Sequence, residues 1–184
     1  MASNNELMHR LPAHRRRIEC CAYEREDGLW DLHGVLSDVK GVDNWLADQT
    51  VKAGELLHEM HITLTVDNKF TIHAAQARTL HAPYRGCPDC NGAYEKLVGI
   101  SLARGFHKRV SELFGGTRGC THINALLAPL ATTAFQAIGT WHIHQGLENR
   151  ETTKLSIDAC HGLRSDGDAV RVHFPDFYNP SQSS

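Results

Sequence analysis

The fold is decided by the stretch at residues 17–36, which reads RIECCAY-EREDG-LWDLHGVL. Its two ends, residues 17–23 and 29–36, are short runs of strand-forming residues. Between them lies Asp27-Gly28, a dipeptide whose glycine readily adopts the positive φ that tight hairpin turns require. The stretch therefore predicts a β-hairpin.

A second hairpin is predicted further along the chain. Residues 55–66 and 69–75 form another alternating pair across Asp67-Asn68, a dipeptide typical of turns. The segment between the hairpins, residues 38–52, is rich in Gly, Asp and Asn, which predicts a long loop or a single helical turn. Long loops of this kind often cover functional sites.

The periodicity changes after a connector at residues 78–92, whose prolines and glycines prevent a long regular element. Short helical patterns follow at 93–101 and 106–114, and a longer one spans 117–138. Pro129 is expected to kink the long helix. One face of that helix is apolar and is expected to pack on the sheet. It consists of Ile123, Leu126, Leu127, Leu130, Ala134 and Ile138.

A last strand is predicted at residues 169–174, after a turn at 165–168. This order predicts an α+β fold: an antiparallel sheet built from two hairpins plus a C-terminal strand, with helices packed on one face. A chain of 184 residues suggests one domain. We therefore expect an irregular N-terminal arm over 1–16, a single α+β domain over 17–178 and a disordered tail over 179–184.

Composition excludes several classes of function. The formal net charge is −2, so no global positive field would attract nucleic acid. No membrane-length apolar stretch and no apolar core of a secretory signal are present, so a cytoplasmic protein is expected. Neither G-x-G-x-x-G nor G-x-x-x-x-G-K-[ST] occurs, which disfavours a nucleotide cofactor. The expected partner is a small-molecule substrate, and a homo-oligomer is left open.

Histidine and cysteine are the unusual counts, with 13 and 6 residues. Gly119-Cys120-Thr121-His122 lies where the long helix is predicted to begin, and a helix N-terminus stabilises a thiolate. Cys120 is therefore the candidate nucleophile, and Gly119 is a candidate for binding an anionic part of the substrate. His122 is either a catalytic group or a hydrogen-bonded histidine at the margin of the core. Cys120 could equally be a small buried apolar residue.

His58 is the second candidate for proton transfer. Alternation along its predicted strand sends His58 and Met60 to one face and Glu59 and His61 to the other. A titrating imidazole in an apolar pocket suits general acid–base catalysis. The alternative is a structural histidine with a satisfied hydrogen-bond partner.

Residues of the first hairpin are candidates for binding the substrate. Tyr23, Trp30, Asp31 and His33 place aromatic and ionisable groups on adjacent predicted strands. Such a sheet face could hold a small aromatic or acyl ligand between ring faces. Ordinary cross-strand packing accounts for the same residues.

A metal site is the alternative use of the thiols and imidazoles. Asp158-Ala159-Cys160-His161 supplies a second Cys-His pair. Cys120, His122, Cys160 and His161 together would make a Cys2His2 site suited to zinc or iron. Cys87 and Cys90 have the C-x-x-C spacing of metal knuckles and redox pairs, but without a second such pair they are better explained as surface thiols.

Four groups of residues form a pattern that spans nearly the whole predicted domain. They are AYEREDGLWD at 22–31, His58 with Met60, GCTH at 119–122 leading to Gln136, and Asp158 with Cys160-His161. The pattern resembles a bacterial family known as a domain of unknown function. The resemblance implies an association with bacterial breakdown of aromatic and other hydrophobic compounds.

These observations predict a small cytosolic enzyme of lyase, isomerase or hydrolase type that performs acid–base chemistry on a hydrophobic or aromatic carboxylic compound. His58 and His122 would transfer protons, and Cys120 would be a nucleophile or a ligand. Tyr23 and Asp31 would orient the substrate. The alternative is a non-catalytic ligand-binding or accessory protein whose Cys/His cluster holds a structural metal, because a closed four-ligand site leaves no position for a substrate.

Overall fold

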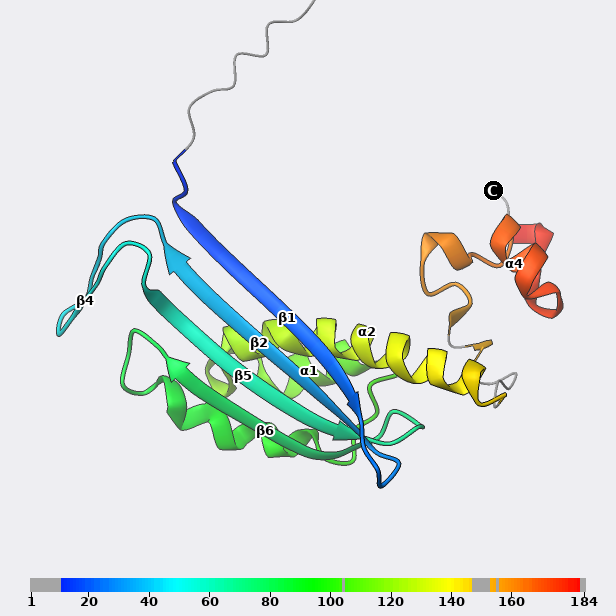
Figure 1. Ribbon diagram of the computed structural model, residues 1–184, viewed down its shortest axis with the longest axis horizontal. Coiled ribbons are helices and arrows are strands. Elements are labelled where there is room, and N and C mark those ends of the chain that lie inside the picture. The colour runs from blue at the N-terminus through cyan, green and yellow to red at the C-terminus, as the bar shows by residue number, and fades with distance from the viewer. Residues whose placement is uncertain (1–10, 104, 147–152, 155, 183–184) are drawn as a thin grey trace, which may run out of the picture. The chain divides into compact units, whose positions relative to one another are not determined.

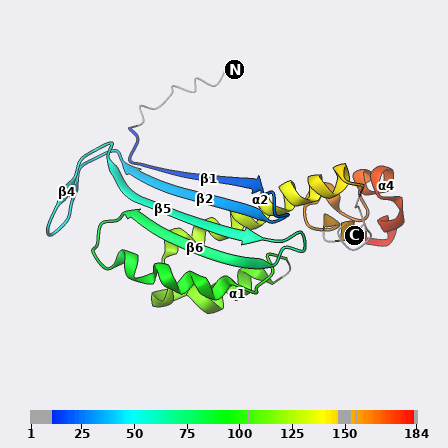
Figure 2. The ribbon, with the colours of Figure 1, turned by 60° about the horizontal axis from the view of Figure 1, so that its bottom comes forward.

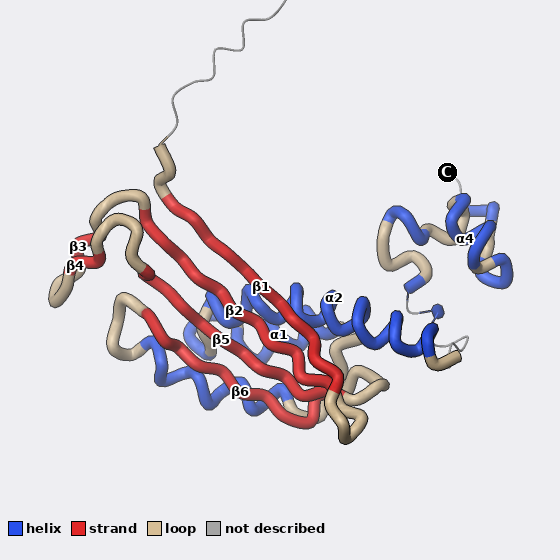
Figure 3. Tube along the Cα trace, in the orientation of Figure 1, coloured by secondary structure: helices blue, strands red, loops and turns tan. Residues whose placement is uncertain are grey.

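A four-stranded antiparallel sheet forms one layer of the protein (Figure 1). The computed structural model describes residues 11–103, 105–146, 153–154 and 156–182. Both predicted hairpins are present, and the second strand of the first pairs with the first strand of the second (Figure 3). In spatial order the strands are β1 (His14–Glu24), β2 (Trp30–Lys40), β5 (Leu56–Val66) and β6 (Ile72–His81).

Alternation along β2 and β5 separates a buried face of the sheet from an open one. Trp30, Leu32, Gly34 and Leu36 of β2 are buried, whereas the residues that alternate with them are partly exposed. Four residues of β5 continue the buried face with no exposed surface: Met60, Ile62, Leu64 and Val66. Asp38 occupies the same register of β2 and is only 1% exposed. A carboxylate buried in an apolar row requires polar partners.

Helical elements cover the buried face (Figure 2). They are η1 (Cys87–Leu97), α1 (Phe106–Phe114), η2 (Gly116–Arg118) and α2 (Thr121–His144). The close approach of α2 requires a glycine in the centre of β2. A Cβ at Gly34 would stand 3.0 Å from Cδ1 of Leu130, so the missing side chain makes room for the helix.

Between β2 and β5 the chain forms a short two-stranded arm, so the predicted loop or single helical turn is wrong. Strand β3 (Asn44–Trp45) pairs antiparallel with β4 (Thr50–Val51). The carboxylate of Asp43 fixes the base of the arm, because it accepts hydrogen bonds from Lys52 Nζ and from the Ala53 N–H, both at 2.9 Å. The arm leaves the sheet at the end where β2 ends and β5 begins (Figure 3).

The chain divides into two compact units, residues 1–134 and 135–184, and the division falls within α2. The second unit contains the C-terminal part of α2 and, among the described residues that follow it, several short helical elements. They are η3 (His161–Leu163), α4 (Asp168–His173), η4 (Pro175–Phe177) and η5 (Pro180–Gln182).

The predicted C-terminal strand at residues 169–174 is wrong, because this segment forms helix α4. Asp168 lies in its first turn, and Arg171 lies one turn later with Nη2 at 3.0 Å from Oδ1 of Asp168. An acidic residue at the start of a helix and basic residues at its end favour the helix over a strand. Pro175 disfavours the helical conformation at Phe174, so the helix stops at His173.

The predicted α+β class, with an antiparallel sheet and helices on one face, is confirmed apart from that last strand. Strand β1 begins at His14, three residues before the predicted domain boundary. Residues 1–10 of the predicted arm and 183–184 of the predicted tail lie outside the described residues. Within the described part of the chain, no helix combines the length and the apolar character needed to cross a membrane.

Leu64 tests the assignment of the buried face. It has no exposed surface, and its side chain lies in the layer between the sheet and the helices. We expect Leu64→Ala to lower the free energy of unfolding by about 2–5 kcal/mol, because it removes buried methyl groups and leaves a cavity. Thr63→Ala, on the open face, should change it by less than about 1 kcal/mol. Urea unfolding measures both, and equal effects would contradict the assignment.

Candidate functional site

Asp38 is the centre of a polar cluster at the arm end of the sheet. Arg16 is its cross-strand partner on β1, and the guanidinium binds both carboxylate oxygens, with Nε at 2.8 Å from Oδ1 and Nη2 at 2.7 Å from Oδ2. His14 Nε2 lies 3.2 Å from Oδ1. The carboxylate that would be costly to bury alone is therefore held as an ion by a bidentate arginine.

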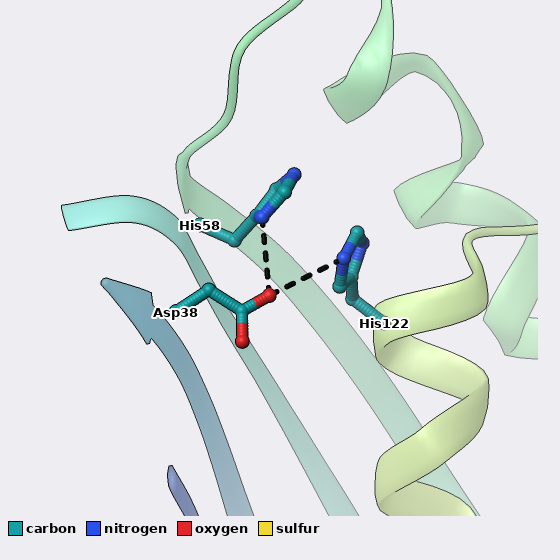
Figure 4. A group of neighbouring side chains, drawn as sticks. All are labelled: Asp38, His58 and His122. Carbon is teal, nitrogen blue, oxygen red and sulfur yellow. Dashed lines mark hydrogen bonds and ion pairs between the residues drawn. The ribbon is translucent and has the colours of Figure 1, made fainter. Parts of the chain in front are cut away.

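Two imidazoles meet the other side of the Asp38 carboxylate (Figure 4). His58 is the cross-strand partner of Asp38 on β5, and its Nδ1 lies 3.1 Å from Oδ2. His122, in the first turn of α2, places Nε2 at 3.4 Å from the same oxygen. The two rings lie 3.9 Å apart between centroids with 30° between their planes. One carboxylate oxygen thus orients two stacked histidines.

The electrostatics of this cluster keep the carboxyl ionised and the imidazoles neutral. Burial opposes ionisation of Asp38, but the Arg16 hydrogen bonds and the charges of Arg16, His14 and His58 outweigh it and hold the pKa of that carboxyl below its usual value. Burial lowers the pKa of His58, against the attraction of Asp38. Burial and then the charge of His58 lower the pKa of His122. A neutral imidazole near pH 7 is able to accept a proton.

Cys120 lies beside His122 at the start of α2. Its carbonyl accepts the first helical hydrogen bond, from the Asn124 N–H at 2.9 Å, so Cys120 is the residue that caps the helix. Its Sγ lies 3.7 Å from His122 Nδ1. The carboxylate of Asp38 favours the tautomer with the proton on Nε2 of His122, which leaves Nδ1 as the acceptor that faces the thiol. Cys120, His122 and Asp38 therefore form a continuous chain of thiol, imidazole and carboxylate.

Tyr94 of η1 holds the backbone of Cys120 in place. Its hydroxyl accepts a hydrogen bond from the Cys120 N–H at 2.9 Å and donates one to Oδ1 of Asn124 at 2.7 Å. The ring is fully buried and stacks on Phe114 with centroids 4.5 Å apart. Burial raises the pKa of Tyr94, so the hydroxyl stays protonated and able to donate.

We expect Tyr94→Phe to lower the free energy of unfolding by about 1–3 kcal/mol, because it leaves the Cys120 N–H and the Asn124 oxygen without this partner. Phe114→Leu, which changes the packing of the same ring without removing a hydrogen bond, serves as the comparison. Urea unfolding gives the stabilities. A Tyr94→Phe protein as stable as the wild type would show that the hydroxyl does not hold the helix start.

Among the residues that the structure describes, Asp38, His58 and His122 form a group that could hold a metal, since one donor atom from each lies within 4.8 Å of the others. Two histidines and a carboxylate are a common ligand set for zinc and iron. The position of Arg16 argues against a metal at this site, because its Nη2 lies 2.7 Å from the Asp38 oxygen that both histidines contact. A guanidinium on the ligating oxygen repels a cation, so this arrangement suits proton transfer better than metal binding.

A family model described as a protein of unknown function (DUF2889) matches residues 14–136, about two thirds of the chain. The chain belongs to the DUF2889 family. Its matched region begins at the first residue of β1 and contains the whole cluster around Asp38. It ends before Asp158 and Cys160-His161. That AYEREDGLWD, GCTH and Asp158 with Cys160-His161 are signatures of the family stays a prediction, as does a bacterial origin. No curated protein and no solved structure matches the chain.

Three predicted catalytic residues of this DUF2889 protein lie together. His58, Cys120 and His122 come from β5, the residue before α2 and the first turn of α2, and they share the Asp38 cluster. Their roles stay predictions. Gly119, predicted to bind substrate, precedes Cys120 but packs closely, since a Cβ there would stand 2.7 Å from Cβ of Phe114.

The other predicted substrate-binding residues lie at the opposite end of the sheet. Trp30 and Asp31 begin β2, eight and seven positions from Asp38, or roughly 23–26 Å at the usual rise of a strand. Trp30 is buried, and its Nε1 donates to Oδ1 of Asn68 at 2.7 Å. Asp31 accepts hydrogen bonds from Thr65 and Arg25, and Tyr23 is 55% exposed. The structure does not bring these three residues to the histidines.

The predicted Cys2His2 site draws on both compact units, because Cys160 and His161 lie in the second one. That site stays a prediction. Cys87 and Cys90 lie in η1, and Cys90 Sγ donates to the carbonyl of Cys87 at 3.4 Å. Burial, and then the nearby charge of Cys120, raise the pKa of Cys90, which makes it a poor nucleophile.

Sequence reasoning missed Asp38, Arg16 and His14. The composition of residues 38–52 predicts a loop that begins at Asp38, but Asp38 continues the buried row at every second position of β2, after Trp30, Leu32, Gly34 and Leu36. A charged residue in the apolar register of a strand was the available signal. A run of three arginines, as at Arg15 to Arg17, is typical of a solvated charged edge, but Arg16 faces Asp38 across the strands. Only the pairing register identifies that contact.

Proposed function

We propose that this DUF2889 protein is a thiol-dependent hydrolase or acyltransferase that acts on an ester or thioester of a hydrophobic or aromatic carboxylic acid. Cys120 is the nucleophile, His122 is the general base and acid, and Asp38 orients His122. The observation that carries the proposal is the pair of contacts made by one imidazole, with Nδ1 at 3.7 Å from the Cys120 thiol and Nε2 at 3.4 Å from Asp38. Catalytic hydrogen bonds are often long without substrate and tighten when it binds.

The first chemical step transfers the acyl group to the enzyme. His122 Nδ1 takes the thiol proton, and the thiolate of Cys120 attacks the carbonyl carbon of the substrate. The carbonyl electron pair moves to oxygen, and the first-turn N–H groups of α2 stabilise that negative charge. When the tetrahedral intermediate collapses, a C–S bond to Cys120 remains, the bond to the leaving group breaks, and His122 gives its proton to the leaving group.

The second step releases the acyl group. His122 takes a proton from water, and the hydroxide formed attacks the thioester carbonyl. Collapse breaks the C–S bond, the carboxylic acid leaves, and Cys120 recovers its proton from His122. An alcohol or amine in place of water would give acyl transfer by the same steps. No metal and no redox partner is required for the balance of either step.

His58 is a positioning residue in this scheme. It shares the Asp38 oxygen with His122 and stacks on the His122 ring, so it restricts the ring to one orientation. When His58 is protonated at acidic pH, its charge opposes protonation of His122 and so lowers the pKa of His122.

The proposal is tested with the full-length protein and a panel of 4-nitrophenyl esters and thioesters of aromatic and aliphatic acids, in buffer that contains EDTA. We expect steady turnover of at least one aromatic ester and an initial burst close to one equivalent of 4-nitrophenolate, since deacylation of activated esters is commonly the slower step. No turnover with any acyl substrate would contradict the proposal. Turnover that EDTA abolishes and zinc restores would favour a metal centre at Asp38, His58 and His122.

The pH profile provides a further prediction. His122 faces Asp38, His58, Arg16, His14 and Cys120, and its pKa lies below the ordinary value of about 6.5. The base form therefore persists below pH 6.5, and the acidic limb of kcat/KM should have its midpoint below that value. In His58→Gln, which removes a ring whose protonated form opposes protonation of His122, the midpoint should move to higher pH. A wild-type midpoint above pH 6.5 that His58→Gln does not move would contradict the assignment of this limb to His122.

A further inference from the structure

A pocket at the arm end of the sheet has no role in the chemistry described so far. Its volume is about 390 Å³, which is within the range of small-molecule sites. One wall is the end of β6 and the chain that follows it, including Leu80, Ala82 and Tyr84. The other wall is the tip of the arm, with Asp48 and Gln49. Gln49 Nε2 donates to the carbonyl of Pro83 at 3.4 Å, which holds the two walls together.

The strand register places this pocket beside the candidate active site. His81, the last residue of β6, pairs with Glu59 of β5, which directly follows His58 in the chain. Ala82 is the residue after His81. Ala82 lines the pocket, and His58 contacts Asp38 in the cluster. The wall of the pocket formed by the chain after β6 therefore begins next to the part of β5 that carries His58, since paired strands lie about 5 Å apart.

The chemistry of the pocket walls selects a ligand. Leu80 and Tyr84 are 54% and 68% exposed, so they offer apolar surface to a ligand body. Arg85 is 93% exposed, and only its Nε is engaged, at 3.5 Å from Oδ2 of Asp48. Among the described residues no hydrogen bond or ion pair reaches its two terminal nitrogens. A guanidinium edge of this kind binds an anionic oxygen group in a bidentate way, and the weak exposed pair with Asp48 is easily displaced.

We propose that this pocket binds the non-reacting part of the acyl substrate, a hydrophobic or aromatic body that carries an anionic oxygen group, and that Arg85 is the residue that selects the anion. This inference rests on the proposed function and names its substrate class. Bound there, the substrate would extend from Arg85 toward Cys120 past His58. The anion has two sources, the acyl part or the leaving group of the ester.

Three 4-nitrophenyl benzoate esters distinguish the two sources of the anion. The first is neutral, the second carries a carboxylate on the benzoyl ring, and the third carries a carboxylate on the nitrophenyl ring. We expect kcat/KM to be at least about tenfold higher for one of the charged esters than for the neutral one. Arg85→Gln should remove that preference through KM and leave the neutral ester within about twofold. Arg109→Gln is the matched control, because Arg109 is also an exposed arginine that pairs with a single carboxylate, that of Glu112. An unchanged preference in Arg85→Gln would overturn the inference.

A direct binding measurement separates failure of this inference from failure of the proposed function. Calorimetric titration of 4-nitrobenzoate into the full-length wild type and the Arg109→Gln variant should show equal binding. Arg85→Gln should bind at least about tenfold more weakly, whether or not any ester is hydrolysed. Binding that Arg85→Gln leaves intact, or no binding to the wild type, would overturn the pocket assignment even if esters are turned over.

Discussion

Cys120→Ala is expected to lower kcat/KM for acyl substrates by at least about 1000-fold, because the covalent step has no other nucleophile in the cluster. The fold should persist, since the backbone of Cys120, not its thiol, makes the contacts to Tyr94 and Asn124. Initial rates with the best ester and circular dichroism check the two statements.

Cys160→Ala is the matched control for that variant. Cys160 is an exposed thiol in the second compact unit. The thiol mechanism predicts full activity for Cys160→Ala. If both cysteine variants lose activity together with a bound metal, the predicted Cys2His2 site would explain the result and the nucleophile assignment would be wrong.

The second large effect is expected from Asp38→Asn. An amide of the same shape keeps the packing but no longer favours the His122 tautomer that directs Nδ1 at the thiol, so we expect a loss of about 100- to 10,000-fold in kcat. KM should change much less, because Asp38 is buried behind the histidines rather than exposed to substrate. Steady-state kinetics measures the split between kcat and KM.

Arg16→Gln separates the catalytic role of Asp38 from its structural role. This variant removes the bidentate partner of the carboxylate but leaves its contacts to His58 and His122. We expect lower stability and a raised pKa of Asp38, with most of kcat retained near pH 7. A loss of kcat in Arg16→Gln as large as in Asp38→Asn would mean that both variants act by disrupting the cluster rather than by removing the orienting carboxylate.

The fold was predictable where the signal is local. The alternation of Leu32 and Leu36 with partly exposed neighbours, and the turn residues at Asp27-Gly28, are properties of adjacent residues, and both hairpins follow from them. The strand predicted at 169–174 was wrong because the segment is short. Six residues that include two valines are too few for the spacing of apolar residues to distinguish a strand from a helix. Asp168 in the first turn and Pro175 just beyond the last residue are start and stop signals of a helix, and they favour the helix that forms.

The candidate site was predictable only in part, because its centre is a tertiary contact. Cys120 and His122 stand close together in a motif at a helix start, so the sequence identifies them. His58 was identified by its position on a core-facing strand. Asp38 carries no motif, and its role depends on the register that places it opposite both Arg16 and His58. Asp38 is separated from each of these partners by 20 or more residues. The pattern of neighbouring residues does not determine which residues pair across strands at that separation.

The central claim is that Cys120 carries the acyl group. The most direct test mixes the full-length protein with excess 4-nitrophenyl benzoate, quenches in acid within the first turnover, and measures the intact mass and the modified residue. We predict one benzoyl group on Cys120, none in Cys120→Ala, and slower formation in His122→Asn. Hydrolysis of the ester with no acylated protein, or with the acyl group on another residue, would contradict the account.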